Sequence, residues 1–204
     1  HQADYIEWGR RITVDGIVIL GGEPLLNPTI NDWVRGLNTA FNKSVQILSN
    51  GTRLNAVPGL YDALNSFKPG EYFTERNWIG ITAHHASDVE QHVDAIHQFL
   101  QGPITNTSAT DRYGAHLAFC DANQTMARLW LTDSFITSNL RPAPATMVNR
   151  QIVPTNKLTL FNNDPAAAHA DCGFASWKNY HMIKGRLYKC GPVALMPEFD
   201  QQFS

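Results

Sequence analysis

Gly21-Gly22-Glu23-Pro24 follows a short apolar run, and its residue types suit an amino-acid-like ligand. Because glycine has no Cβ, a ligand can approach this backbone closely, and Pro24 restricts the direction in which the chain leaves the turn. The carboxylate of Glu23 can accept hydrogen bonds from an ammonium group. The same four residues would also suit a tight turn between a strand and a helix, so the motif alone leaves both interpretations open.

Small and polar residues gather at three later points of the chain, each directly after an apolar run. They are Ser49-Asn50-Gly51, Thr82-Ala83-His84-His85 and Asp121-Ala122-Asn123. The four apolar runs are short and contain β-branched residues, which predicts strands at residues 16–20, 44–48, 78–82 and 115–120. Residues 128–136 fit either a strand or a helix.

Apolar residues at helical spacing lie between these strands. They predict helices at residues 30–41, 60–67 and 87–100, the last with a capping box from Ser87 to Glu90. Strands that alternate with helices form a parallel sheet through right-handed crossovers, either doubly wound or part of a β/α barrel. Ligands bind at the carboxyl ends of the strands in both architectures. We therefore expect a ligand site where the polar segments meet.

The composition limits the class of protein. With 43% hydrophobic and 17% charged residues among 204, the chain can bury a substantial core. A net charge of −2 gives no strongly basic surface and disfavours a nucleic-acid partner. No run approaches the ~18 apolar residues of a membrane span, so we expect no membrane partner and a cytoplasmic location. The three cysteines, an odd number, disfavour a secreted disulfide framework.

The composition changes after about residue 138 towards proline, alanine, asparagine and threonine. This change predicts a first domain at residues 1–138 and a linker with a small carboxy-terminal segment at residues 139–204. The second segment contains Cys172 and Cys190. From the residues alone, this pair could be two metal ligands or two unrelated buried thiols.

The segment DGIVILGGEPLLNP resembles the second strand and the following turn of the radical S-adenosylmethionine (SAM) superfamily. ILSNGTRL and WIGITAHH resemble the third and fourth strands of that superfamily. The resemblance implies an α/β fold, a partial (β/α)6 radical SAM barrel with a small carboxy-terminal auxiliary-cluster lobe. It also implies SAM-binding roles for the strand-end residues: Gly21, Gly22, Glu23 and Pro24 at the amino group, Ser49 and Asn50 at the ribose, and Thr82 or His84 on the far side.

The carboxy-terminal segment resembles the opening of a SPASM or twitch auxiliary-cluster domain. The resemblance rests on Cys172, Gly185 and Cys190, the last two within KGRLYKC. It implies that Cys172 and Cys190 ligate an auxiliary iron–sulfur cluster, with a glycine turn between two strands bringing the thiolates together.

One departure from the superfamily affects what the chain can do. The signature CxxxCxxC, which holds the catalytic [4Fe–4S] cluster, does not occur in residues 1–204. In the superfamily it precedes the GGEP strand by one strand and one helix, and residues 3–12 resemble the tail of such a helix. We therefore expect the chain to be a fragment whose cluster ligands lie upstream.

The implied function is reductive cleavage of SAM to a 5′-deoxyadenosyl radical that abstracts hydrogen from a small-molecule, peptide or protein substrate. Flavodoxin or ferredoxin would supply the electron, and no residue is assigned as a general acid or base. Two alternatives remain open. One is a non-catalytic SAM-barrel binding or scaffold protein. The other is a metal-dependent β/α-barrel hydrolase using His84, His85 and a carboxylate such as Glu23 or Asp121.

Overall fold

The computed structural model describes residues 2–67, 76–111, 114–131, 151–152, 158–159 and 180–189, with residues 166, 194, 197 and 201. The chain divides into two compact units, residues 2–139 and residues 140–204 together with residue 1. Among the described residues, no helix is long and apolar enough to cross a membrane.

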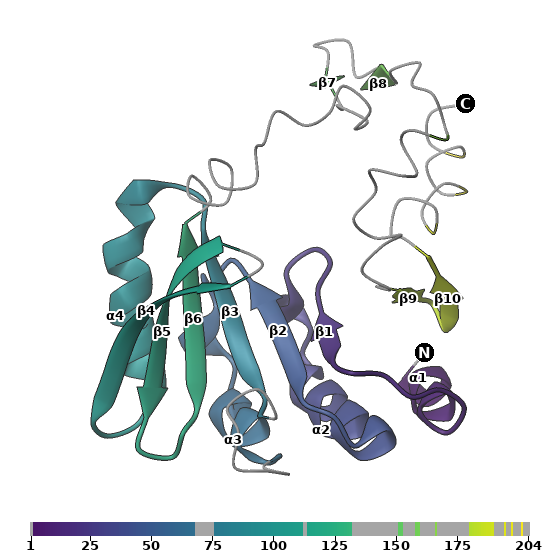
Figure 1. Ribbon diagram of the computed structural model, residues 1–204, viewed down its shortest axis with the longest axis horizontal. Helices are drawn as coiled ribbons and strands as arrows, with labels where there is room; N and C mark the ends of the chain where they lie inside the picture. The colour runs from purple at the N-terminus through teal and green to yellow at the C-terminus, as the bar shows by residue number, and fades with distance from the viewer. Residues whose placement is uncertain are drawn as a thin grey trace. The chain divides into compact units, whose positions relative to one another are not determined.

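The first unit has an α/β fold, in which helices accompany a mixed six-stranded sheet (Figure 1). Its elements, in chain order, are α1 (Gln2–Gly9), β1 (Ile17–Ile19), η1 (Pro24–Leu26), α2 (Ile30–Phe41), β2 (Val45–Ser49), η2 (Leu54–Ala56), α3 (Leu60–Asn65), β3 (Trp78–Ala83), η4 (Ala86–Asp88), α4 (Val89–Phe99), β4 (Ile104–Asp111), β5 (Gly114–Asp121) and β6 (Met126–Leu131). The strand order is β1-β2-β3-β6-β5-β4. The α/β class and the first three strand-helix units agree with the sequence-based prediction, whereas closure into a barrel stays a prediction.

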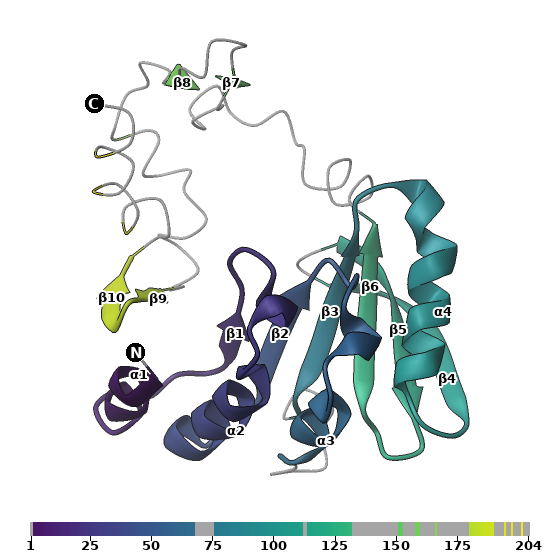
Figure 2. The ribbon, with the colours of Figure 1, turned by 180° about the vertical axis from the view of Figure 1, so that it is seen from behind.

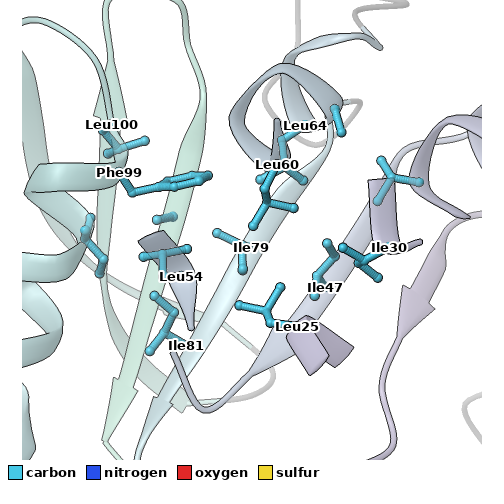
Figure 3. Packing of buried hydrophobic residues seen from close by; sticks show 14 of the residues in the cluster. Leu25, Ile30, Ile47, Leu54, Leu60, Leu64, Ile79, Ile81, Phe99 and Leu100 are labelled. Atoms are coloured by element: carbon cyan, nitrogen blue, oxygen red, sulfur yellow. The ribbon is translucent and has the colours of Figure 1, made fainter. Parts of the chain in front are cut away.

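Helices α2, α3 and α4 contribute buried side chains to a single core with the sheet, and Figure 2 views the unit from their side. The register places Ile47 of β2 beside Ile79 of β3, which lies beside Ala127 of β6. Because side chains alternate across a strand, these three share one face of the sheet. Figure 3 shows Ile47 and Ile79 packed among side chains that include Leu60 of α3.

The reversed direction of β5 corrects the predicted parallel sheet. Strands β1, β2, β3 and β6 pair in parallel, but β5 is antiparallel to both β6 and β4. Strand β4 was not predicted, because residues 104–111 (ITNTSATD) are largely polar. The ambiguous residues 128–136 overlap β6, which is a strand over Met126–Leu131.

The predicted capping box at the start of α4 is also wrong. The helix has Asp88 as its N-cap residue, without a capping hydrogen bond from its side chain. Ser87 instead donates from its hydroxyl to Oδ1 of Asp88, at 3.1 Å.

The second unit contains two short antiparallel pairs, β7 (Gln151–Ile152) with β8 (Leu158–Thr159) and β9 (His181–Ile183) with β10 (Arg186–Tyr188). The turn between β9 and β10 has positive φ at Lys184 and Gly185, 50° and 75°. A glycine turn between two strands was predicted here, and this part of the prediction is confirmed. Cys172 and Cys190, the predicted cluster ligands, lie outside the described residues.

The alternation along β2 predicts very different effects for two neighbouring substitutions. Ile47 is 0% exposed in the core, whereas Leu48, on the opposite face, is 37% exposed. We expect Ile47→Ala to lower the free energy of unfolding by about 2–5 kcal/mol, and Leu48→Ala to lower it clearly less. Urea unfolding followed by circular dichroism measures both. Equal losses would contradict this assignment of the two faces.

Candidate functional site

The turn that leaves β1 depends on its two glycines. Gly21 and Gly22 have φ values of 103° and 58°, in the left-handed region that favours glycine. A Cβ at either position would meet no atom within 4 Å, so backbone conformation, and not crowding, requires glycine here. Both residues are exposed, which leaves this stretch of backbone accessible to a ligand.

The Glu23 carboxylate joins the end of β1 to the end of β2. Oε1 accepts hydrogen bonds from the Leu25 amide at 3.0 Å and from the Ser49 hydroxyl at 2.7 Å. Oε2 accepts from the Asn50 amide at 2.8 Å. We call these three hydrogen bonds the Glu23 brace. Through the Leu25 contact, Glu23 also caps the short η1 helix, where Pro24 occupies the first turn without needing an amide partner.

The brace continues into the turn after β2. The Ser49 hydroxyl accepts from the Gly51 amide at 2.9 Å, so it both donates and accepts, and the Ser49 residue is only 5% exposed. Oδ1 of Asn50 accepts from the amide and hydroxyl of Thr52, at 3.0 and 2.8 Å. This local hydrogen bonding is typical of asparagine in turns. Both predicted ribose-contacting residues are therefore held in place, and Asn50 is the more accessible of the two.

Thr82 and His84 lie at the same edge of the sheet. The register pairs Ser49 with Ile81, so the next residues along the two strands, Asn50 and Thr82, lie beside each other at the carboxyl ends of β2 and β3. Thr82 is half-buried, and His84 is exposed directly after β3. The structure thus brings the predicted strand-end residues of β1, β2 and β3 to one edge: Gly21, Gly22, Glu23, Pro24, Ser49, Asn50, Thr82 and His84.

A buried histidine that was not assigned to the site lies directly behind this edge. His92 of α4 is 8% exposed, and a Cβ on Gly51 would lie 3.0 Å from its Nδ1 atom. Burial lowers the pKa of His92; the Asp88 carboxylate raises it and His84 lowers it further. His97, on the same helix, is exposed, so the two histidines do not share a face. The contact joins residues far apart in sequence, and spacing alone does not reveal it.

Asp121 does not belong to this edge, which corrects the prediction for Asp121-Ala122-Asn123. Because β5 runs antiparallel, Cys120 pairs with Met126 at the start of β6, and the turn lies at the amino-terminal edge of the parallel strands. The Asp121 carboxylate accepts from the Tyr61 hydroxyl at 2.6 Å and from the amides of Gln101, Asn123 and Thr125. These contacts give Asp121 a structural role, tying α3 and the end of α4 to the hairpin.

The helix-free face of the sheet, among the described residues, has its own aromatic cluster. The Trp78 and Trp130 rings lie 5.6 Å apart between centroids, and the Arg128 guanidinium lies 4.3 Å from the Trp78 centroid. A Cβ on Gly80 would overlap the Trp130 ring, so the missing side chain makes room for it. Trp130 is 6% exposed and packs in a buried cluster with Trp78 and Met126.

Potential metal ligands do not gather into a cluster in the part of the chain that the structure describes. No cluster of three or more histidine, cysteine or acidic side chains that could hold a metal ion occurs there. Cys120 is half-buried, and burial raises the pKa of its thiol, with the Asp121 charge adding to the increase. Cys120 therefore has the properties of a small packed thiol.

Comparisons of the chain with protein-family models, with curated proteins and with solved structures gave no match.

The brace predicts a large effect of a small chemical change. In Glu23→Gln, one of the two carboxylate oxygens becomes an amide nitrogen that cannot accept a hydrogen bond from Leu25, Ser49 or Asn50. We expect the free energy of unfolding to fall by about 1–3 kcal/mol, measured by urea unfolding. Glu90→Gln, at an exposed position of α4, is the matched control and should change it by less than about 0.5 kcal/mol. Equal effects would contradict the brace.

The surroundings of Asp121 predict a specific dependence of stability on pH. Burial raises the pKa of Asp121, but its four hydrogen bonds outweigh burial and hold the pKa below the ordinary value. The pKa of Asp121 is lower in the folded state than in the unfolded state. The stabilisation that ionised Asp121 contributes is therefore fully present above about pH 4 and is lost as pH falls through the folded-state pKa. In Asp121→Asn, we expect a smaller loss of stability between pH 5 and pH 2 than in wild type, measured by urea unfolding. An unchanged acid dependence would contradict this role.

Proposed function

We propose that the chain is the SAM-binding part of a radical SAM enzyme that abstracts hydrogen from a substrate. The Glu23 brace carries this proposal. It joins the GGEP turn to Ser49 and Asn50, two segments that the sequence resemblance assigns independently to one cofactor. Strand β3 adds Thr82 and His84 at the same edge, so the residues expected to contact SAM are neighbours across three parallel strands.

The chemistry of this edge fits the amino-acid part of SAM. Oε2 of Glu23 accepts one hydrogen bond, from Asn50, and a carboxylate oxygen has two lone pairs, so it can accept another from an ammonium group. The exposed backbone at Gly21 and Gly22 offers carbonyl acceptors beside it. Asn50 and Thr82 provide polar groups for ribose hydroxyls. The protein would bind and orient the cofactor at this edge and shield it from water.

SAM bound beside a reduced [4Fe–4S] cluster supplies a 5′-deoxyadenosyl radical. The CxxxCxxC ligands of such a cluster are not among residues 1–204, and the residues at this edge would bind and orient the cofactor. Cys172 and Cys190 remain proposed ligands of an auxiliary cluster. The proposed partners are a small-molecule, peptide or protein substrate and a flavodoxin or ferredoxin as electron donor.

The two alternatives differ in their support. A non-catalytic SAM-binding protein would use the same edge and would need no CxxxCxxC ligands. The metal-dependent hydrolase loses one proposed carboxylate, because Asp121 lies at the opposite edge of the sheet.

The test uses the complete reading frame, expressed and reconstituted without oxygen with iron and sulfide. We expect iron and acid-labile sulfide beyond one [4Fe–4S] cluster, loss of only the excess in a Cys172→Ala, Cys190→Ala variant, and 5′-deoxyadenosine on addition of a reductant. Glu23→Gln should weaken SAM binding by roughly 10–100-fold in calorimetry, since a hydrogen bond to a charged group contributes about 1.5–3 kcal/mol. Glu90→Gln is the control.

Two results would decide against the catalytic proposal. Protein without an iron–sulfur cluster that still binds SAM would be a binding protein. Protein that binds neither would leave the whole assignment without support.

A further inference from the structure

We infer that His92 is a positioning residue of this site: its neutral imidazole, packed against Gly51, holds the turn after β2 in place for the Glu23 brace, and protonation of His92 loosens that turn. The part of the inference that concerns SAM rests on the proposed function. The part that concerns the turn does not, because every contact involved lies within the chain.

The contacts form a continuous path from α4 to Glu23. A Cβ on Gly51 would lie 3.0 Å from Nδ1 of His92 and 3.2 Å from its Cε1, so the imidazole lies against the Gly51 backbone. The Gly51 amide donates to the Ser49 hydroxyl, at 2.9 Å, and this hydroxyl donates to Oε1 of Glu23, at 2.7 Å. A shift of the His92 ring therefore displaces a residue bonded directly into the brace.

The charges around His92 act in opposite directions. Burial lowers its pKa most, the Asp88 carboxylate raises it, and a charge on His84 lowers it. Gly51, which lies against the ring, is uncharged. Glu90 and Asp94 line the other, exposed side of α4, in a shallow hollow with Ser87, Gln91, Ala95 and Gln98. Burial therefore favours the neutral form of His92, and a proton on its ring must be accommodated in a site that is 8% exposed.

Protonation and ligand binding are then linked. A protonated imidazole ring is stabilised by water and by hydrogen-bond acceptors, which the contact with Gly51 does not provide. The charged form of His92 therefore favours a looser turn. A ligand that needs the ordered turn binds better to the protein in which His92 is neutral. By reciprocity, the same ligand lowers the pKa of His92 by the same factor. His84, beside the proposed SAM site, couples to His92 through its charge.

The first test needs no ligand. NMR would follow the His92 ring and the hydrogen-exchange protection of the Asn50 and Gly51 amides between pH 8 and pH 5, corrected for the intrinsic exchange rate. We expect protection to fall at least about fivefold as His92 becomes protonated. His92→Gln should remove this pH-dependent step, and His97→Gln, at an exposed position of the same helix, should keep it. A step that persists in His92→Gln, or no step in wild type, would overturn the inference.

Two further variants keep the test valid if His92→Gln folds poorly. His84→Gln removes a charge that lowers the pKa of His92, so the midpoint of the step should move to higher pH. Asp88→Asn removes the opposing charge and should move it to lower pH. Midpoints that do not move with these charges would mean that another group titrates.

The second test separates this inference from the proposed function. S-adenosylhomocysteine serves as the probe, and its dissociation constant is measured by calorimetry at pH 8 and pH 5. We expect at least about fivefold weaker binding at pH 5 in wild type, and less change in His92→Gln. Equal binding at both pH values would overturn the inference while leaving the proposed function intact. A protection step without any binding would support the positioning role and count against the proposed function.

Discussion

The local arrangement of this protein's proposed site depends on one carboxylate that accepts three hydrogen bonds from neutral donors. Glu23 receives them from Leu25, Ser49 and Asn50, on two segments that parallel pairing alone brings near each other. Hydrogen bonds to a charged acceptor are stronger than those between neutral groups. The positive φ values of Gly21 and Gly22 set the turn from which Glu23 reaches these donors, and the core beneath β2 and β3 fixes their register.

The sequence predicted the elements that carry this edge because their signals are local. The β-branched runs before Gly21, Ser49 and Thr82 and the helical spacing between them do not depend on the rest of the fold. The direction of β5 could not be predicted, since an apolar run has the same period whether a strand is parallel or antiparallel. Asp121 was consequently assigned to the wrong edge. Strand β4 was missed because its polar composition gives little strand signal.

The bonding within the site was also beyond sequence reasoning. The resemblance implied that Glu23 meets a ligand, but not that its carboxylate is already bonded to Ser49 and Asn50. The role of His92 depends on its packing against Gly51, which requires α4, packed on β3 and β6, to lie beside the turn after β2. Such contacts between distant segments follow from tertiary packing, which leaves no repeating pattern in the sequence.

The antiparallel meander of β4, β5 and β6 affects the order in which the sheet can assemble. Each of its pairings joins consecutive strands through a short connection, so closing these loops costs little chain entropy. The parallel pairings of β1 with β2 and β2 with β3 each span a helix and require longer closures. On entropic grounds, we expect the meander to form as an early local unit and the edge that carries the Glu23 brace to be completed late. The edge with the proposed site would then be the last part of this sheet to become ordered during folding and the first to open.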